Sequence, residues 1–257
     1  MRMDRWLLLT ATLLAFSASV GGMISVHCGR RSQSTVIWMT AVMLCQLAML
    51  AIRGNQHGVC PLVDWGERLV FLSWALTLFY LLVGQAYRIS LLGVFTAPVV
   101  VTFQSIALLP GVLSAHAQPI AGGNLWHEMH SATSVLSYGA LALASVAGVM
   151  FLVLNRQLKG QHLKSGLFRN LPPVRELLTS LERLLWLGIG LLSLGLIAGL
   201  LMPHDGKATA HRIAALIVWT CYATLLAVHA SRGLTGRRIS LLSVSLFILS
   251  LGVFALI

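Results

Sequence analysis

The stretch WHEMHSATSVLSYGALALASVAGVMFLVL, from Trp126 to Leu154, places two histidines and a glutamate directly before a long apolar run. Residues 131–154 carry no charged side chain, and about 20 such residues are enough to cross a bilayer. Within lipid the backbone must satisfy its own hydrogen bonds, so this run is predicted to be a transmembrane helix. His127 and His130 lie directly before the start of this helix, although burying an imidazole in a membrane is energetically costly. They are therefore the first candidates for a functional site.

The rest of the chain repeats this pattern. Of its 257 residues 57% are hydrophobic and 10% are charged, whereas soluble domains carry about 25% charged residues. Eight apolar runs are predicted to span a membrane, at residues 7–26, 36–52, 68–86, 91–114, 131–154, 184–202, 212–229 and 239–257. We therefore predict an all-α fold, a polytopic transmembrane helical bundle of about eight spans that forms a single transmembrane domain over residues 1–257.

The basic residues set the orientation. The formal net charge is +11, but Lys and Arg are spread over short loops between apolar runs, so a nucleic-acid partner is not expected. With the N-terminus outside, 12 of the 18 basic residues lie on the inner side. Because inner loops are enriched in Lys and Arg, an N-out, C-out topology follows. The first span also resembles the start of a signal peptide, and that alternative stays open.

The inner segment 155–183 differs from the other loops. Its first part, NRQLKGQHLKSG, is basic, and LPPVRELLTSLERLLW then repeats leucine at helical spacing after Pro172 and Pro173. We predict a cytoplasmic loop with an amphipathic helix at the membrane interface, just before the sixth span.

Most of the nine histidines lie at the outer ends of the predicted spans. This outer group comprises His57, His116, His127, His130, His204 and His211. Neutral histidine is a common metal ligand and an axial ligand of haem iron, so their gathering at one face favours ligation. An interfacial histidine that merely tolerates a polar boundary is the alternative for each of them. His229, in LLAVHASRG at the inner end of the seventh span, is the sharpest single case.

Four stretches resemble the cytochrome c assembly proteins of the CcsA/CcmC type. They are ERLVFLSWALTLFYLLVGQAYRISLLGVFTAPV, MHSATSVLSYGALALAS, RQLKG with LPPVRELLTSLERL, and DGKATAHRIAALIVWTCYATLLAVHASRGLTGRR. The resemblance covers about residues 65–240 and implies that His130 is an outer haem ligand and His229 a ligand within the membrane. It also implies haem b as the cofactor, with both histidines on haem iron.

This sequence departs from that family in one segment. The tryptophan-rich segment that presents haem for attachment is expected between Gly199 and Asp205, where the chain reads GLLMPHD. We therefore assign the chain to the shorter HemX/YpjD-like branch, name no catalytic residue and do not expect thioether formation. His204 or His211 is a candidate for the missing outer ligand, His27 for an inner partner of His229, and Trp126, Trp65 and Trp219 for lining or anchoring.

The sequence thus predicts a multi-pass protein of the bacterial inner membrane that binds or handles haem in cytochrome c maturation or haem metabolism. Its expected partners are haem, the lipid bilayer and other cytochrome c assembly or haem-biosynthesis proteins. Two alternatives stay open: a non-catalytic membrane regulator or scaffold for haem biosynthesis that works through the loop at 155–183, and a transporter lined by histidines. The latter is disfavoured by the lack of a predicted intramembrane carboxylate pair.

Overall fold

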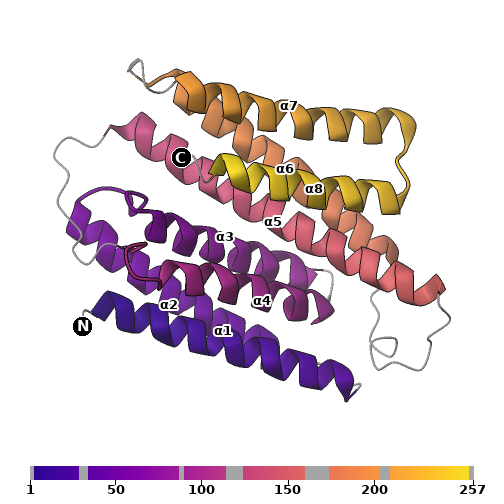
Figure 1. Cartoon of the computed structure of the whole chain (residues 1–257), viewed down its shortest axis with the longest axis horizontal. Helices are drawn as coiled ribbons and strands as arrows, with labels where there is room; N and C mark the ends of the chain where they lie inside the picture. Colours follow the sequence, from indigo (N-terminus) through magenta and orange to yellow (C-terminus); the bar gives the residue numbers. More distant parts are fainter. Residues whose placement is uncertain are drawn as a thin grey trace. The chain divides into compact units, whose positions relative to one another are not determined.

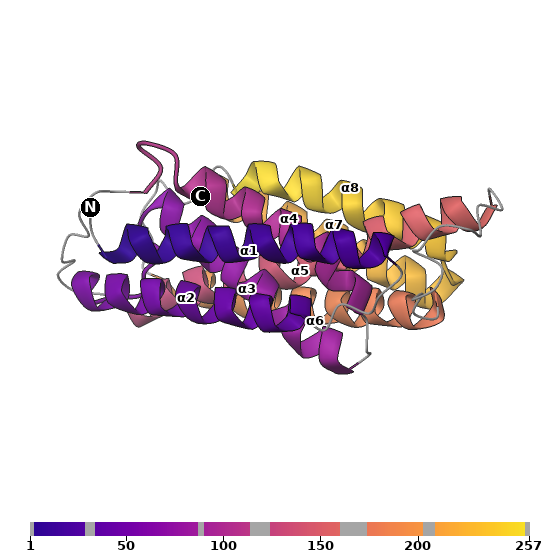
Figure 2. The ribbon, with the colours of Figure 1, turned by 90° about the horizontal axis from the view of Figure 1, so that it is seen from below.

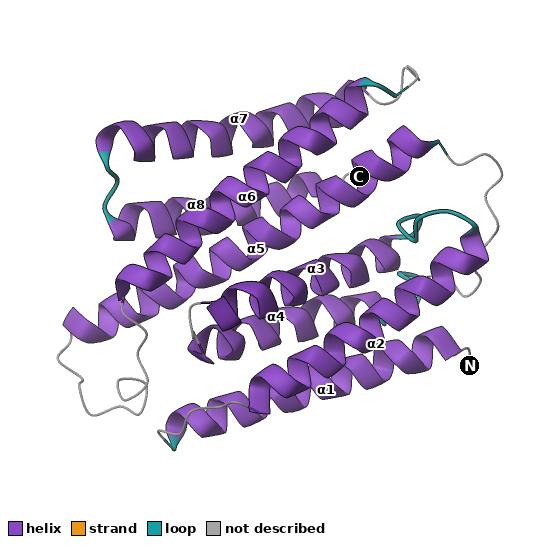
Figure 3. Ribbon diagram, turned by 180° about the vertical axis from the view of Figure 1, so that it is seen from behind, coloured by secondary structure: helices purple, strands orange, loops and turns teal. Residues whose placement is uncertain are grey.

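The computed structural model describes residues 3–28, 34–86, 90–113, 124–159, 174–202 and 209–254. Within these ranges the chain forms eight α-helices and no strand, which confirms the all-α prediction (Figure 3). The helices are α1 (Met3–His27), α2 (Ser34–His57), α3 (Trp65–Ala86), α4 (Ser90–Ala107), α5 (Leu125–Lys159), α6 (Val174–Leu200), α7 (Thr209–Arg232) and α8 (Gly236–Phe254).

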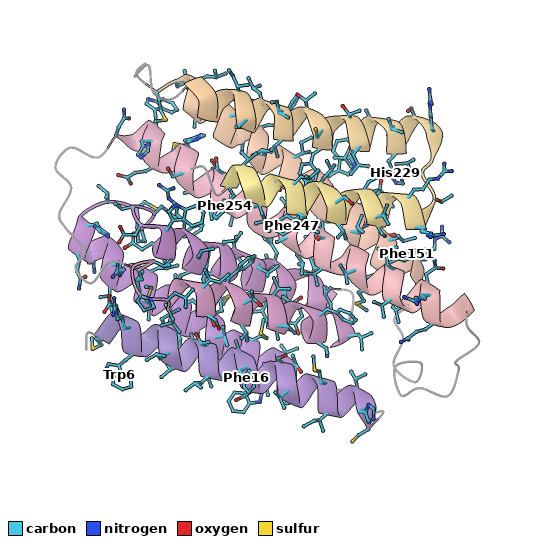
Figure 4. All side chains as sticks on the ribbon, in the orientation of Figure 1. Trp6, Phe16, Phe151, His229, Phe247 and Phe254 are labelled. Atoms are coloured by element: carbon cyan, nitrogen blue, oxygen red, sulfur yellow. The ribbon has the colours of Figure 1, made fainter. Side chains whose placement is uncertain are left out.

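Length and composition agree with a polytopic membrane protein. Seven of the described helices are long and apolar enough to cross a bilayer, and the eighth, α4, is a shorter apolar helix. α4 ends at Ala107 rather than at residue 114, because a turn follows in which Gly111 adopts a φ of 85°. Large apolar side chains such as Trp6 and Phe16 point outward from α1, as expected of a lipid-facing surface (Figure 4).

Two helices extend well beyond the predicted spans. α2 continues past residue 52 to His57, and α5 runs for 35 residues from Leu125 to Lys159. α6 has no break at 183–184, so residues 174–183 form the first turns of the same helix as the sixth span. Residues 160–173 lie outside the described ranges, and the interfacial location of 174–183 stays a prediction.

The chain divides into two compact units, which we describe separately; the prediction of a single transmembrane domain stays a prediction. The first unit contains α1 to α4. In it α1 packs against α2 and α4, while α3 packs against α2 and α4, so the four helices form a bundle (Figures 1 and 2). Close contacts such as Gly22 against Val94 and Gly93 against the Tyr80 ring allow these helices to approach one another.

The second unit contains α5 to α8. Its α8 packs against both α5 and α7 (Figure 1). Tyr138 of α5 donates a hydrogen bond to the Ser250 carbonyl of α8 (3.3 Å) and lies 5.2 Å, centroid to centroid, from the Phe254 ring. Trp219 of α7 donates from Nε1 to Ser193 Oγ of α6 (2.8 Å), which ties these two helices together. The second unit contains both histidines for which haem ligation is predicted.

Candidate functional site

His130 lies in the second turn of α5 and reaches across to α6. Asn124 caps the start of α5, because its Oδ1 accepts the Trp126 N–H at 3.0 Å. The His130 ring is partly buried, and its Nδ1 lies 2.7 Å from the backbone carbonyl oxygen of Gly195. The two residues are 65 positions apart in the sequence, so tertiary packing between α5 and α6 creates this bond.

This hydrogen bond sets the chemistry of the His130 ring. A carbonyl oxygen can only accept, so Nδ1 carries the proton and donates it. In the neutral imidazole Nε2 then holds the lone pair that a metal needs. Metal-ligating histidines typically donate their other ring N–H to a carbonyl or carboxylate in this way. His130 therefore fits the role of an axial ligand to haem iron.

His229 lies in the last turn of α7, near the connection to α8 (Figure 4). Its carbonyl accepts the N–H of Gly233, whose φ of 64° ends the helix. The ring Nε2 faces the Glu182 carboxylate of α6 at 3.8 Å, beyond hydrogen-bond distance. Its Nδ1 is buried without a hydrogen-bond partner in the described structure. A buried polar atom without a partner is unfavourable, so this ring fits a residue that takes up a further ligand.

The two histidines lie at opposite ends of the second unit. His130 contacts α6 at Gly195 and His229 faces α6 at Glu182. Glu182 and Gly195 are 13 residues apart on α6, which corresponds to about 20 Å along a straight helix. One iron therefore cannot bind both rings, and the role of each ring as a ligand stays a prediction.

The other predicted site residues are placed less fully. His211 lies in the first turn of α7, which follows the end of α6 near His130, and nothing is described of its side chain. His204 lies outside the described residues. His27 is exposed at the end of α1 in the first unit, so its pairing with His229 stays a prediction. Trp126 is 40% exposed in the first turn of α5.

The predicted lining tryptophans and the neighbouring His127 also differ in their surroundings. Trp65 is half-exposed at the start of α3, and Trp219 donates to Ser193 inside the second unit. His127 is exposed one turn before His130. The three-residue spacing of the two histidines on α5 therefore does not give them equal access to α6.

A buried ionic cluster in the first unit was not predicted from the sequence. Arg53 of α2 is fully buried, and its Nε lies 3.1 Å from Asp4 Oδ2 of α1. Its Nη1 lies 2.8 Å from Glu67 Oε1 of α3 and 3.4 Å from Asp64 Oδ2. His57, one turn further along α2, lies 2.8 Å from the same Glu67 oxygen. Asp4 and Glu67 are thus a pair of buried carboxylates next to one arginine. Both lie just outside the predicted spans 7–26 and 68–86, so the absence of an intramembrane carboxylate pair stays a prediction.

The sequence held a signal for this cluster. The buried face of α2 includes Met39, Val42, Gln46, Met49, Arg53 and His57, a single stripe at helical spacing. The stripe continues into Arg53 and His57 instead of ending at residue 52. An arginine on the buried stripe of an apolar helix predicts an acidic partner, although not which one.

Comparisons with known proteins show which family the chain belongs to. The sequence model of a protein family described as "Cytochrome C assembly protein" matches residues 62–255. The "Cytochrome c biogenesis protein CcsA" of Microcystis aeruginosa is 28% identical, over 80% of this chain and 78% of that protein. The protein of the same name from Synechococcus sp. (strain CC9902) is 30% identical, over 77% of this chain and 74% of that protein. The matched residues include His130, His229 and, in the first unit, helices α3 and α4.

Proposed function

The chain belongs to the cytochrome c assembly protein family, and on this premise we propose that it binds haem and handles it for cytochrome c maturation. His130 is the outer ligand in this proposal and His229 the inner one. The observation that carries it is the bond between His130 Nδ1 and the Gly195 carbonyl, because with Nδ1 protonated the lone pair of the neutral ring is on Nε2.

The residues of this chain perform defined tasks in that function. α5 and α6 hold the His130 ring in one tautomer, and the apolar helices keep the surroundings of the ring poor in water. Bound haem would supply an iron that accepts a histidine nitrogen. At the other end of α6, the Glu182 carboxylate faces His229 Nε2 at 3.8 Å.

Some finer parts of the proposal rest on the sequence alone. They are haem b as the form bound, the bacterial inner membrane as location, other assembly proteins as partners, and membership of the shorter HemX/YpjD-like branch. The stretch GLLMPHD without tryptophan supports only this last point. The regulator and transporter alternatives stay predictions from the sequence, and no contact described above favours them.

The proposal is tested by spectroscopy of the purified protein. The chain is expressed with added haem precursor, extracted in mild detergent and examined by reduced-minus-oxidised difference spectra and by a pyridine haemochrome assay. We expect a haem signal that is strongly reduced in His130→Ala and altered in His229→Ala, because under this proposal each ring would hold haem iron.

His127→Ala is the matched control, because His127 is exposed on the same helix one turn away. Its spectrum should match that of the unaltered protein. A colourless protein would overturn haem binding. A normal haem signal in both His130→Ala and His229→Ala would instead show that other residues hold the iron.

A further inference from the structure

The face of α6 that meets α5 is built around three glycines. Built in ideal geometry, a Cβ on Gly188 would lie 2.6 Å from Leu141 Cδ2, and one on Gly195 would lie 2.8 Å from Ser134 Oγ. A Cβ on Gly199 would lie 2.9 Å from His130 Nδ1 and 3.1 Å from His130 Cε1. The residue numbers of these contacts increase along α6 while they decrease along α5. The two helices therefore run antiparallel and pack closely.

The contact at Gly199 differs in kind from the other two. Gly188 faces an apolar side chain and Gly195 faces small hydroxyl residues, whereas Gly199 faces the imidazole that is the proposed ligand. The His130 ring thus lies against the bare Cα of Gly199 while its Nδ1–H donates to the carbonyl of Gly195. Gly199 thus borders the ring, and the Gly195 carbonyl fixes the proton on Nδ1.

We propose that Gly195 and Gly199 form a positioning site, the His130 seat, which fixes the tautomer and the orientation of the His130 ring so that Nε2 is presented to haem iron. This inference rests on the proposed function. Neither glycine touches the iron; both act through His130. Glycine at position 199 leaves room for the ring in this orientation, because an added Cβ would lie 2.9 Å from His130 Nδ1 and the ring would have to shift.

The seat predicts a local effect for Gly199→Ala. The atoms that a new methyl group would meet belong to the end of a side chain, so the His130 ring moves while the helix backbone stays. A displaced ring loses its bond to the Gly195 carbonyl and its preference for the Nδ1–H tautomer. Loss of such an outer partner typically weakens metal affinity 10–100-fold.

Two variants of the same helix separate this effect from general packing. Gly190→Ala adds a methyl group where no atom lies within 4 Å, and Gly188→Ala crowds Leu141 without touching His130. If the seat exists, Gly199→Ala alters the ligand strongly, Gly188→Ala alters only the thermal stability of the bundle, and Gly190→Ala alters neither. Gly195→Ala presses on Ser134 and Thr133 and should lengthen the bond to His130, giving an intermediate result.

The first measurement uses the protein without haem. Imidazole ¹⁵N chemical shifts of histidine-labelled protein in detergent report the tautomer of each ring, and His130→Gln assigns the His130 signals by their disappearance. We expect a single Nδ1–H tautomer for His130 in the unaltered protein, in Gly188→Ala and in Gly190→Ala. In Gly199→Ala we expect a mixture of tautomers. An unchanged tautomer in Gly199→Ala would overturn the seat, whether or not the protein binds haem.

The second measurement uses the haem-loaded protein. Haem titration and the midpoint potential of the bound haem are compared across the same variants. We expect Gly199→Ala to bind haem about tenfold more weakly, with a shifted potential, and Gly190→Ala to behave as the unaltered protein. Equal affinity and equal potential in all variants would overturn the seat. A colourless unaltered protein overturns the proposed function instead, and the tautomer measurement still decides the seat.

Discussion

Arg53 of α2 is the largest fully buried side chain among the described residues, and its guanidinium contacts the carboxylates of Asp4 on α1 and Glu67 on α3. A buried ion group of this kind adds little when complete, because desolvation offsets the attraction between the charges. Removal of one partner is different, since it leaves an unpaired charge in an apolar interior. The cluster therefore acts as a specific fastening of α1, α2 and α3.

We expect Arg53→Met to destabilise the protein by about 3–5 kcal/mol, because Asp4 and Glu67 would both lose their cation. Asp64→Asn is the matched control, since Asp64 is 22% exposed and lies 3.4 Å from Arg53, so its loss should cost about 1 kcal/mol or less. Thermal unfolding in detergent, followed by circular dichroism, measures both. Similar midpoints for the two variants would show that the cluster does not hold the helices.

At the same scale, the sequence predicted His130 but not the atoms that hold it. Its place before an apolar run identified an ionisable residue at a membrane boundary. The Gly195 carbonyl lies 65 residues away, and a backbone oxygen has no signature in a sequence. The pairing of Asp4 with Arg53 spans 49 residues and was hidden for the same reason. Long-range partners follow from packing, which local patterns do not encode.

At the scale of the elements, the spans were predictable because lipid admits few solutions. A charge-free run of sufficient length must be a helix there, and each of the eight predicted runs forms a helix over most of its described residues, although α4 ends at Ala107. The ends were less predictable. Hydropathy alone ends the second span at residue 52. α2 continues through Arg53 to His57 because ion pairs compensate the charges of this polar end when it is buried.

α6 carries a second prediction at this scale. Leu181, in the segment predicted to lie at the membrane interface, is fully buried, and its Cδ1 approaches Gly148 of α5. We expect Leu181→Ala to destabilise the protein by about 2–5 kcal/mol, because the contacts with α5 are lost and a cavity remains. Thermal unfolding in detergent tests this expectation.

The control for Leu181→Ala is Leu194→Ala in the same helix. Leu194 is 57% exposed, so its truncation should change the unfolding midpoint little. If Leu181→Ala were as mild as Leu194→Ala, the first turns of α6 would not be packed as the structure shows. In that case residues 174–183 would behave as a separate surface helix.

At the scale of the whole molecule, the loop charges predict that both ends of the chain face outward. Cys28, exposed after α1, is then inside, and Asn124, exposed at the start of α5, is outside. The other three cysteines are changed to serine to leave Cys28 alone, and a second variant carries Asn124→Cys without native cysteines. An impermeant maleimide should label Asn124→Cys in intact cells and Cys28 only after permeabilisation. The reverse pattern would contradict the predicted topology.

α6 also sets the distance between the two histidines. A straight helix keeps its Gly195 and Glu182 levels about 20 Å apart, whatever the side chains around it do. Under the proposed function, a porphyrin that travels between the two ends must leave one imidazole before it reaches the other. Release of haem from one histidine and its binding by the other are then separate steps, and the slower step limits the rate of haem transfer.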